Sequence, residues 1–188
     1  FFCGANMSKR FIVISLACFV FLYAFYSLYR IGSTLAPDFS VFYDSAKALL
    51  SHQNPYELTS IYTGLGYPPF TLLAFMPFTV LSYQTAQILW ILISFSLFLL
   101  SISLSLRIVR KRVLFPEWCL VFIFAFLAFP TKFTFGMGQI NFAALTLLLI
   151  SLWAQQHNRW ALSGIAFGIL LMMKPHFMLF IPVYLLGG

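Results

Sequence analysis

Aspartate and glutamate are scarce in this 188-residue sequence, which has four of them against eleven lysines and arginines. Two of the four, Asp38 and Asp44, fall in the stretch 37–44, just after the first long apolar run. One carboxylate beside a substrate hydroxyl is enough for general-base catalysis, so Asp38 is a candidate base or electrostatic stabiliser. Because it follows a proline and precedes a helical pattern, it is equally placed to cap a helix N-terminus. Asp44 falls on the polar side of that pattern, where we expect solvent.

A second candidate is the triplet Lys174-Pro175-His176, which interrupts an apolar run near the end of the sequence. A lysine in an apolar run is costly unless it has a counter-charge or a cavity. The proline breaks the helix and frees backbone carbonyls there. The pattern predicts that Lys174, with His176 beside it, binds an anionic ligand such as a lipid phosphate. The alternative is that Lys174 only extends its ammonium group to the membrane interface.

Uncharged polar side chains form two further candidates. Gln139 and Asn141 sit in a glycine-containing stretch, Gly136-Met137-Gly138-Gln139-Ile140-Asn141, where their amides could hydrogen-bond sugar hydroxyls or cap a helix. Tyr67 precedes two prolines, and this pairing predicts either a rigid wall beside a polar ligand or an aromatic side chain at the membrane interface.

The composition identifies the surroundings of these residues. The sequence is 62% hydrophobic and only 8% charged, with a mean hydropathy of +0.95. A soluble domain carries about 25% charged residues, so this chain is predicted to be an all-α integral membrane protein whose first partner is the lipid bilayer. The net charge of +7 then reflects topology and contact with anionic lipids, and no nucleic-acid partner is expected. No metal site is expected either, because the three histidines lie far apart and no cysteine stands at ligand spacing.

Five apolar segments are predicted to enter the membrane: 11–29, 84–106, 118–131, 142–153 and 160–173. Lys9 and Arg10 precede the first segment, and Arg107, Arg110, Lys111 and Arg112 follow the second. The positive-inside rule puts both groups of cations in the cytoplasm, which leaves residues 30–83 as a long extracytoplasmic loop. Because successive segments cross in opposite directions, 132–141 is predicted to be an extracytoplasmic turn and 155–159 a cytoplasmic one.

The long loop contains helical and broken segments. Apolar residues recur there at helical spacing, which predicts an amphipathic helix lying on the membrane surface. They are Phe39, Phe42, Tyr43, Ala46, Leu49 and Leu50. Asn54-Pro55-Tyr56 should end this helix, and Gly64, Gly66 and the two prolines after Tyr67 make a second break. Residues 70–80 are apolar but short and contain Pro77, so we expect a half-inserted segment that does not cross.

Taken in order, four of these motifs resemble one family of proteins. Asp38-Phe39, Tyr67-Pro68-Pro69, Gly138-Gln139-Ile140-Asn141 and Lys174-Pro175-His176 are similar to the N-terminal half of the membrane proteins of glycosyltransferase family 87. Those are polyprenol-phosphate-mannose-dependent alpha-mannosyltransferases and their relatives, with the GT-C fold. The resemblance implies that 1–188 is a single transmembrane domain, an N-terminal fragment of a longer GT-C-type domain.

The resemblance also implies a chemistry. The donor would be a polyprenyl-phosphate sugar, the acceptor a lipid or glycan, and the sugar would move with inversion at the outer face of a bacterial inner membrane. Asp38 would be the base, and Lys174 would stabilise the leaving phosphate, with Lys132 and Arg30 as alternatives. Tyr67, Gln139, Asn141 and His176 would bind substrate, without metal or cofactor. Two alternatives stay open: a transporter or channel subunit with Lys174 at a broken helix, and an inactive remnant.

Overall fold

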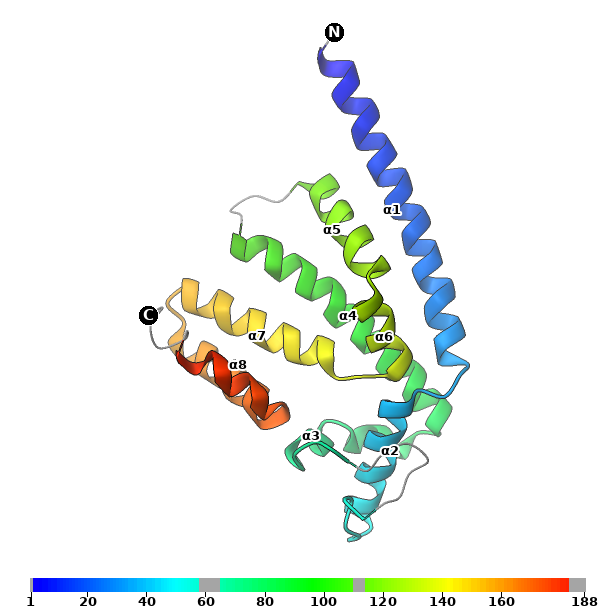
Figure 1. Cartoon of the computed structure of the whole chain (residues 1–188), viewed down its shortest axis with the longest axis vertical. Helices are drawn as coiled ribbons and strands as arrows, with labels where there is room; N and C mark the ends of the chain where they lie inside the picture. The colour runs from blue at the N-terminus through cyan, green and yellow to red at the C-terminus, as the bar shows by residue number, and fades with distance from the viewer. Residues whose placement is uncertain (1, 58–64, 110–113, 183–188) are drawn as a thin grey trace.

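The computed structural model describes residues 2–57, 65–109 and 114–182, with side chains from residue 10 onward. Within these ranges all regular secondary structure is helical, which confirms the predicted all-α membrane protein (Figure 1). The elements are α1 (Phe2–Gly32), α2 (Pro37–Leu50), α3 (Phe70–Leu73), the 3₁₀-helix η1 (Met76–Val80), α4 (Tyr83–Val109), α5 (Phe115–Leu127), α6 (Phe129–Met137), α7 (Asn141–Gln156), α8 (Trp160–Met173) and the 3₁₀-helix η2 (Pro175–Phe180).

Two of these helices are long and apolar enough to cross a bilayer unaided. They are Arg10–Gly32 within α1 and the whole of α4, with 23 and 27 residues. At about 1.5 Å per residue each exceeds the roughly 30 Å of hydrocarbon. Their lengths confirm the predicted segments 11–29 and 84–106. The apolar helix α8 has the predicted bounds 160–173 but is shorter, with 14 residues.

The predicted span 118–131 and outer turn 132–141 are wrong in their bounds. The chain forms α5, bends by 63° and continues as the helix α6, so that only Gly138 to Ile140 remain as a turn. The extended backbone of Ala128 makes the break, and Pro130 follows near the start of α6. Proline has no N–H and its ring clashes with the preceding turn, which explains why the helix cannot run straight through.

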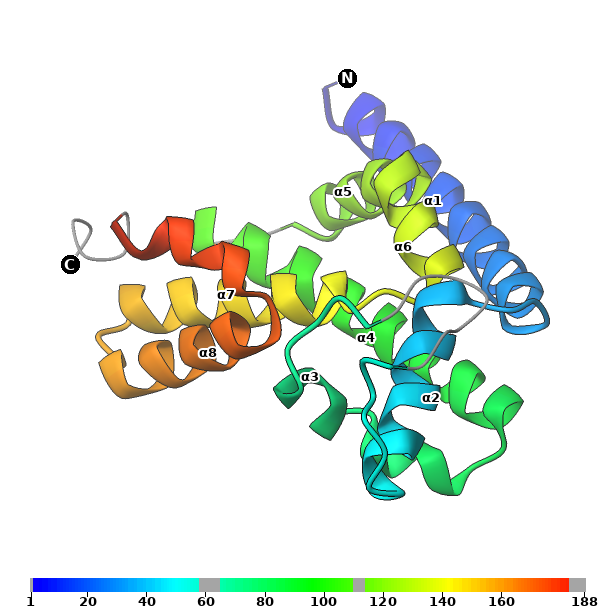
Figure 2. The same ribbon diagram turned by 60° about the horizontal axis from the view of Figure 1, so that its bottom comes forward.

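Hydroxyl groups join the helices where they pack closely. Ser151 of α7 and Ser163 of α8 each donate to the backbone carbonyl of the other, at 2.9 and 3.0 Å. The hydroxyls of Ser101 on α4 and Thr146 on α7 lie 2.9 Å apart. Small polar residues let helices approach closely and satisfy each other within lipid. In both views α4 and α7 run alongside each other, with α8 on one flank and α1 and α5 on the other (Figures 1 and 2).

The predicted amphipathic helix is present as α2, and its apolar face packs against other parts of the protein. Phe39, Phe42 and Ala46 are fully buried, because aromatic side chains of α3, η1 and α4 cover that face. The ring of Phe42 stacks on that of Phe75 with centroids 4.5 Å apart. Leu50 was placed on the same face and is instead 52% exposed. Aromatic residues that are remote in sequence therefore bury the apolar face of α2.

The apolar segment 70–80 forms two short turns of helix, α3 and η1, separated by a bend. Neither is long enough to cross a bilayer, in agreement with the prediction that this segment does not cross. Pro77 stands in the first turn of η1, and Phe75 and Phe78 point into the aromatic layer under α2. The segment therefore closes one end of the bundle (Figure 2).

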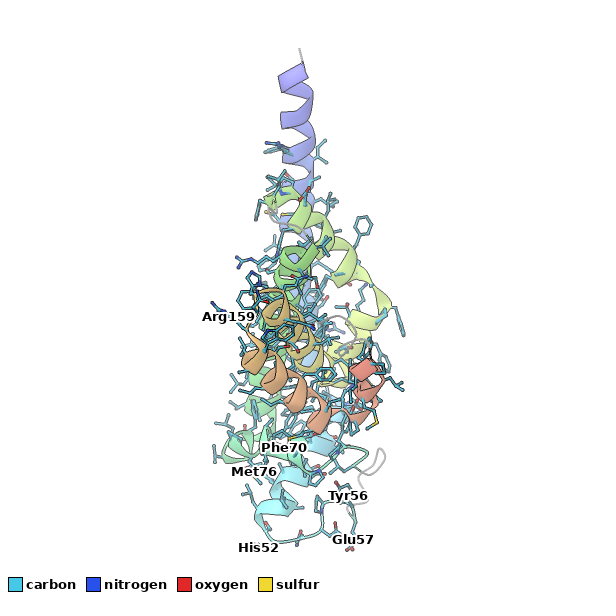
Figure 3. The ribbon with its side chains drawn as sticks, turned by 90° about the vertical axis from the view of Figure 1, so that its left-hand side faces the viewer. His52, Tyr56, Glu57, Phe70, Met76 and Arg159 are labelled. Carbon is cyan, nitrogen blue, oxygen red and sulfur yellow. The ribbon has the colours of Figure 1, made fainter. Side chains whose placement is uncertain are left out.

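Predicted inner and outer segments fall at opposite ends of the helices. The α2 layer and the tip with His52 and Glu57 lie away from the N-terminus, whereas Arg159 lies nearer to it, beyond Phe70 and Met76 (Figure 3). Gly64 and the cations Arg110, Lys111 and Arg112 are outside the described residues, as is the side chain of Lys9.

Candidate functional site

Lys174 directly follows α8, where the helix ends before Pro175. Its backbone N–H closes the last turn on Leu170 O at 2.8 Å, and Thr71 of α3 donates to the neighbouring Met173 O at 3.3 Å. The ammonium group is half-buried and donates to Asn141 Oδ1 at the start of α7. Lys174 is therefore held beside polar groups, at the end of the bundle that carries α2.

Asn141 connects Lys174 to the predicted amide pair. Lysine only donates hydrogen bonds, so the oxygen of the Asn141 amide must face it and the nitrogen must point the other way. That nitrogen donates to Gln139 Oε1 and, at 3.2 Å, to Thr134 Oγ1. The predicted amides are therefore both part of one network with Lys174, and neither is a helix N-cap: the N-cap of α7 is Ile140.

Tyr67 lies on the other side of Lys174. The lysine Nζ is 5.7 Å from the centroid of the tyrosine ring, and the ring packs 4.8 Å from that of Phe42 in α2. Tyr56 donates to the Tyr67 carbonyl at 3.0 Å. Burial, and to a lesser degree the negative charge of Asp38, raise the pKa of the Tyr67 hydroxyl. Tyr67 thus forms one aromatic wall of the cluster.

Asp38 lies in the first turn of α2 and is partly buried. The N-cap of α2 is Ala36, and no side chain caps the helix, so the capping alternative is excluded. Among the described residues, none donates a hydrogen bond to the Asp38 carboxylate. Burial lowers the pKa of Lys174 while Asp38 acts in the opposite direction, which places the carboxylate within electrostatic range of the ammonium group. The four predicted motifs therefore contribute to one cluster, made of Asp38, Tyr67, Asn141 with Gln139, and Lys174.

Gly138 sets how closely the turn before α7 approaches α2. Its φ is +70°, and a β-carbon there would lie 2.7 Å from Phe39 Cβ and 3.1 Å from Ala36 Cβ. Trp90 of α4 donates to the Gly138 carbonyl at 2.9 Å. Only glycine accepts both this conformation and this contact. The turn carrying Gln139 and Asn141 is thus pressed against the first turn of α2, next to Asp38.

Gln87 of α4 has a positioning role that the sequence reasoning did not identify. This buried amide accepts from the Ala36 N–H at 3.3 Å and donates to the carbonyls of Ile31 and Thr34. It therefore ties the end of α1 to the start of α2, just before Asp38. An amide about one turn inside a largely apolar span was the available signal, because buried polar groups need partners.

The other predicted residues lie apart from the cluster. His176 is exposed, and its ring packs against that of Phe177, with centroids 4.9 Å apart. Among the described residues, His176 forms no hydrogen bond with Lys174 or Asn141. Asp44 is exposed, as predicted. Glu57 accepts from Asn54 at 2.8 Å, and Glu117 accepts from the Leu114 N–H at the start of α5. Within the described residues, no three His, Cys, Asp or Glu side chains gather into a group that could hold a metal ion.

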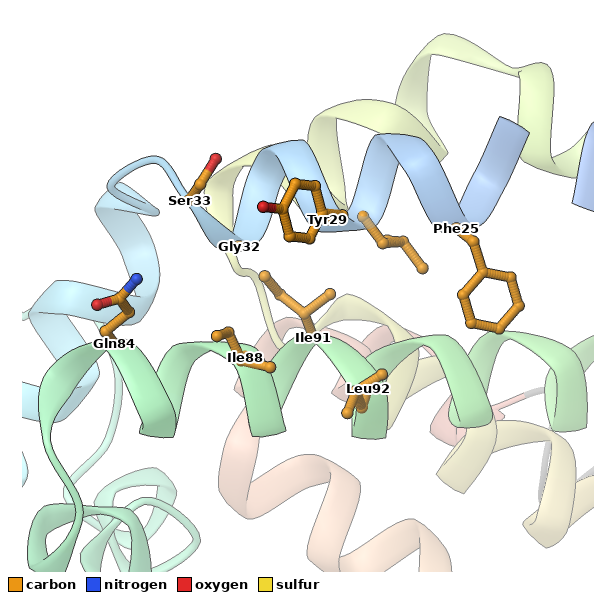
Figure 4. Close-up of a pocket in the computed structure, with 9 residues that line it drawn as sticks. Phe25, Tyr29, Gly32, Ser33, Gln84, Ile88, Ile91 and Leu92 are labelled. Atoms are coloured by element: carbon orange, nitrogen blue, oxygen red, sulfur yellow. The ribbon is translucent and has the colours of Figure 1, made fainter. Parts of the chain in front are cut away.

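A separate apolar pocket lies between α1 and α4 (Figure 4). Its volume is about 260 Å³, and Phe25, Tyr29, Ile88 and Leu92 are among the side chains that line it. Gln84 is at the end nearest α2. None of the clustered residues lines this pocket, so it is not part of the candidate site.

The helices and the cluster together define an integral membrane protein with a charged and polar site at one end of a helical bundle. Comparison with protein-family models matches residues 65–188 to glycosyltransferase family 87. The match covers more than half of the chain, which therefore belongs to this family of membrane glycosyltransferases. It includes Tyr67, Gln139, Asn141 and Lys174 but not Asp38. Comparisons with curated proteins and with solved structures gave no match.

Proposed function

We propose that this protein moves a sugar, which we assign as mannose, from a polyprenyl-phosphate donor to a lipid or glycan acceptor. The reaction would take place at the outer face of a bacterial inner membrane, with the N-terminus in the cytoplasm. The observation that carries the proposal is that the polar turn before α7 contacts both ends of the sequence: Gly138 packs against Ala36 and Phe39, which flank Asp38, and Asn141 accepts from Lys174. A carboxylate and a cation held close together in this way suit a reaction that removes a proton and releases an anion.

In the proposed reaction Asp38 takes the proton of the acceptor hydroxyl. The acceptor oxygen forms a bond to the anomeric carbon as the bond from that carbon to the phosphate oxygen breaks. The electron pair leaves with the polyprenyl phosphate, whose negative charge Lys174 stabilises. One displacement inverts the anomeric centre and needs one base, in contrast to the paired carboxylates of glycoside hydrolases. The amides of Gln139 and Asn141 would orient sugar hydroxyls.

The absence of hydrogen-bond donors to Asp38 among the described residues supports its role as a base. A carboxylate oxygen without a hydrogen-bond donor in the protein is able to accept a hydrogen bond from the hydroxyl of an acceptor. Lys174 is oriented by a neutral amide, so its positive charge is not cancelled by direct pairing and stays available to a phosphate.

The test is sugar transfer by Asp38→Asn in membranes that contain the full protein. Asparagine keeps the size of the side chain but cannot accept the proton, so we expect a loss of about 10²–10⁴-fold in turnover at normal protein level. The measurement is transfer of radiolabelled sugar from polyprenyl phosphate to endogenous lipid, normalised to inserted protein.

Asp44→Asn is the matched control, because Asp44 is on the same helix and exposed. Its transfer rate should stay close to that of the wild type. Near-normal transfer by Asp38→Asn would remove the base assignment and the main residue-level support for the proposed reaction.

A further inference from the structure

Arg30 and Lys132 are about one hundred residues apart in sequence and line one pocket. The pocket lies between α1 and the bent pair α5 and α6 and has a volume of about 410 Å³. This volume is in the range of small-ligand sites in proteins, about 300–1,000 Å³. Both cations are exposed side chains, and neither contributes to the Asp38–Lys174 cluster.

No carboxylate faces these two cations. All four acidic residues of the chain are described, and they lie in α2, in the loop after it and at the start of α5, where none lines the pocket. Lys132 also stands in the first turn of α6, where the helix dipole disfavours a positive charge. Its ammonium group lies over the ring of Tyr23, with 5.8 Å to the ring centroid, and forms no hydrogen bond or ion pair with the described residues. The pocket thus holds two positive charges that a bound anion would compensate.

The remaining walls are mostly apolar, although Tyr23, Tyr26 and Ser27 also line the pocket. Leu28 and Ile31 of α1 face Phe126 and Phe135 of the bent pair. A small inorganic anion would leave these walls without a partner, whereas a lipid offers both a negative headgroup and an apolar chain. Arg30 is in the last turn of α1, and Lys132 is in the first turn of α6, so both cations lie near the ends of apolar helices, where lipid headgroups are expected.

We propose that this pocket binds the phosphate headgroup of an anionic glycerophospholipid, with Arg30 and Lys132 as the two cationic contacts. The lipid is taken from the surrounding bilayer and lies between α1 and α6. It would steady the bend between α5 and α6. The site is distinct from the proposed site of sugar transfer and does not depend on it.

The experiment measures lipid retention by the purified protein in detergent, by native mass spectrometry during titration with phosphatidylglycerol. We expect Arg30→Gln/Lys132→Gln to bind phosphatidylglycerol at least about tenfold more weakly than the wild type, because two charge-assisted contacts are lost. Lys47→Gln/Arg159→Gln removes the same charge elsewhere and should stay within about twofold of the wild type. Ser27→Glu, which places a carboxylate in the pocket, should weaken binding as the double variant does.

Two further titrations identify the occupant. Zwitterionic phosphatidylcholine should bind weakly to every variant. Polyprenyl phosphate is the second titrant. If it bound more tightly than phosphatidylglycerol and this affinity fell in the pocket variants, the site would bind phosphate, but the assignment to a glycerophospholipid would be overturned. Wild-type affinity in Arg30→Gln/Lys132→Gln and in Ser27→Glu would overturn the site itself. If Lys47→Gln/Arg159→Gln lost as much affinity as Arg30→Gln/Lys132→Gln, the loss would depend only on net charge, and this result would also overturn the site.

Discussion

Lys174 takes its orientation from one neutral partner. The Asn141 amide accepts from its ammonium group and is itself fixed by Gln139 and Thr134, so the cation is positioned without being neutralised. Salt bridges position charges too, but they cancel the field that a leaving anion would meet. A neutral amide network of this kind is suited to present a positive charge to a ligand that arrives and departs.

Lys174→Met should leave insertion unchanged but weaken use of the polyprenyl-phosphate donor. Loss of one charge-assisted contact to phosphate costs on the order of 1.5–3 kcal/mol, or roughly 10–150-fold in kcat/KM for the donor. Donor titration in the membrane transfer assay measures it, and Lys47→Met on the exposed side of α2 is the control. Unchanged donor dependence would mean that Lys174 serves only structure.

At the scale of the elements, the site depends on how closely the turn after α6 approaches α2. Gly138→Ala forces a side chain into a left-handed conformation, at about 1–2 kcal/mol, and into contact with Phe39, at about 1–3 kcal/mol more. We expect a clear drop in thermal unfolding temperature together with reduced transfer. Gly168→Ala in α8 meets nothing within 4 Å and should be neutral or stabilising by up to about 1 kcal/mol. Equal behaviour of the two variants would refute the close contact.

The link between α1 and α2 gives a second prediction at this scale. Gln87→Leu leaves the Ala36 N–H and the Thr34 carbonyl without their buried partner, whereas the Ile31 carbonyl keeps its hydrogen bonds from Thr34. Each such group costs about 1–3 kcal/mol, so we expect lower stability and, because Asp38 follows this link, lower transfer. Gln84→Leu, one turn earlier and exposed, should have little effect on either. Thermal unfolding and transfer are measured on the same membrane preparations, and a stable, fully active Gln87→Leu would contradict the positioning role.

At the scale of the whole molecule, the alternating ends of the helices give a topology that can be tested directly. Cysteines introduced at Ser51 and Gln156, in a background without the native cysteines, should react with a membrane-impermeant reagent from opposite sides. Ser51 is at the end of α2 and Gln156 at the far end of α7. Labelling of Ser51→Cys in intact cells, with Gln156→Cys labelled only after permeabilisation, is the expected result. Labelling of both from one side would exclude the arrangement.

Much of this architecture follows from sequence patterns that act locally. The bounds of α8 are those predicted, because a polar turn precedes it and Lys174-Pro175 ends it. The bend between α5 and α6 was missed, since apolar composition on both sides of Ala128 hides a change in backbone direction. The burial of α2 could not be predicted either, because the aromatic residues that cover it come from α3, η1 and α4.

In the candidate site, too, local sequence patterns identified the residues but not the contacts that bring them together. Residue types indicated Asp38, Tyr67, Asn141 and Lys174 individually, and the structure brings them together. Their proximity depends on contacts such as that between Trp90 and Gly138, which no local pattern encodes. His176 was included as part of the Lys174-Pro175-His176 motif, and the 3₁₀-helix that begins at Pro175 leaves it exposed.

The hydrogen bond between Thr71 and the Met173 carbonyl joins residues 102 positions apart, and it has a consequence for biosynthesis. At about 5–20 residues per second, roughly 7 to 27 s separate the synthesis of Asp38 from that of Lys174. During that interval α1, α2 and α4 can enter the membrane and pack, but the carboxylate has no cation beside it. A nascent chain stopped before α8 would therefore lack the cation that the proposed reaction requires. Assembly of the cluster is thus a late step, reached only once α8 and Lys174 have been synthesised.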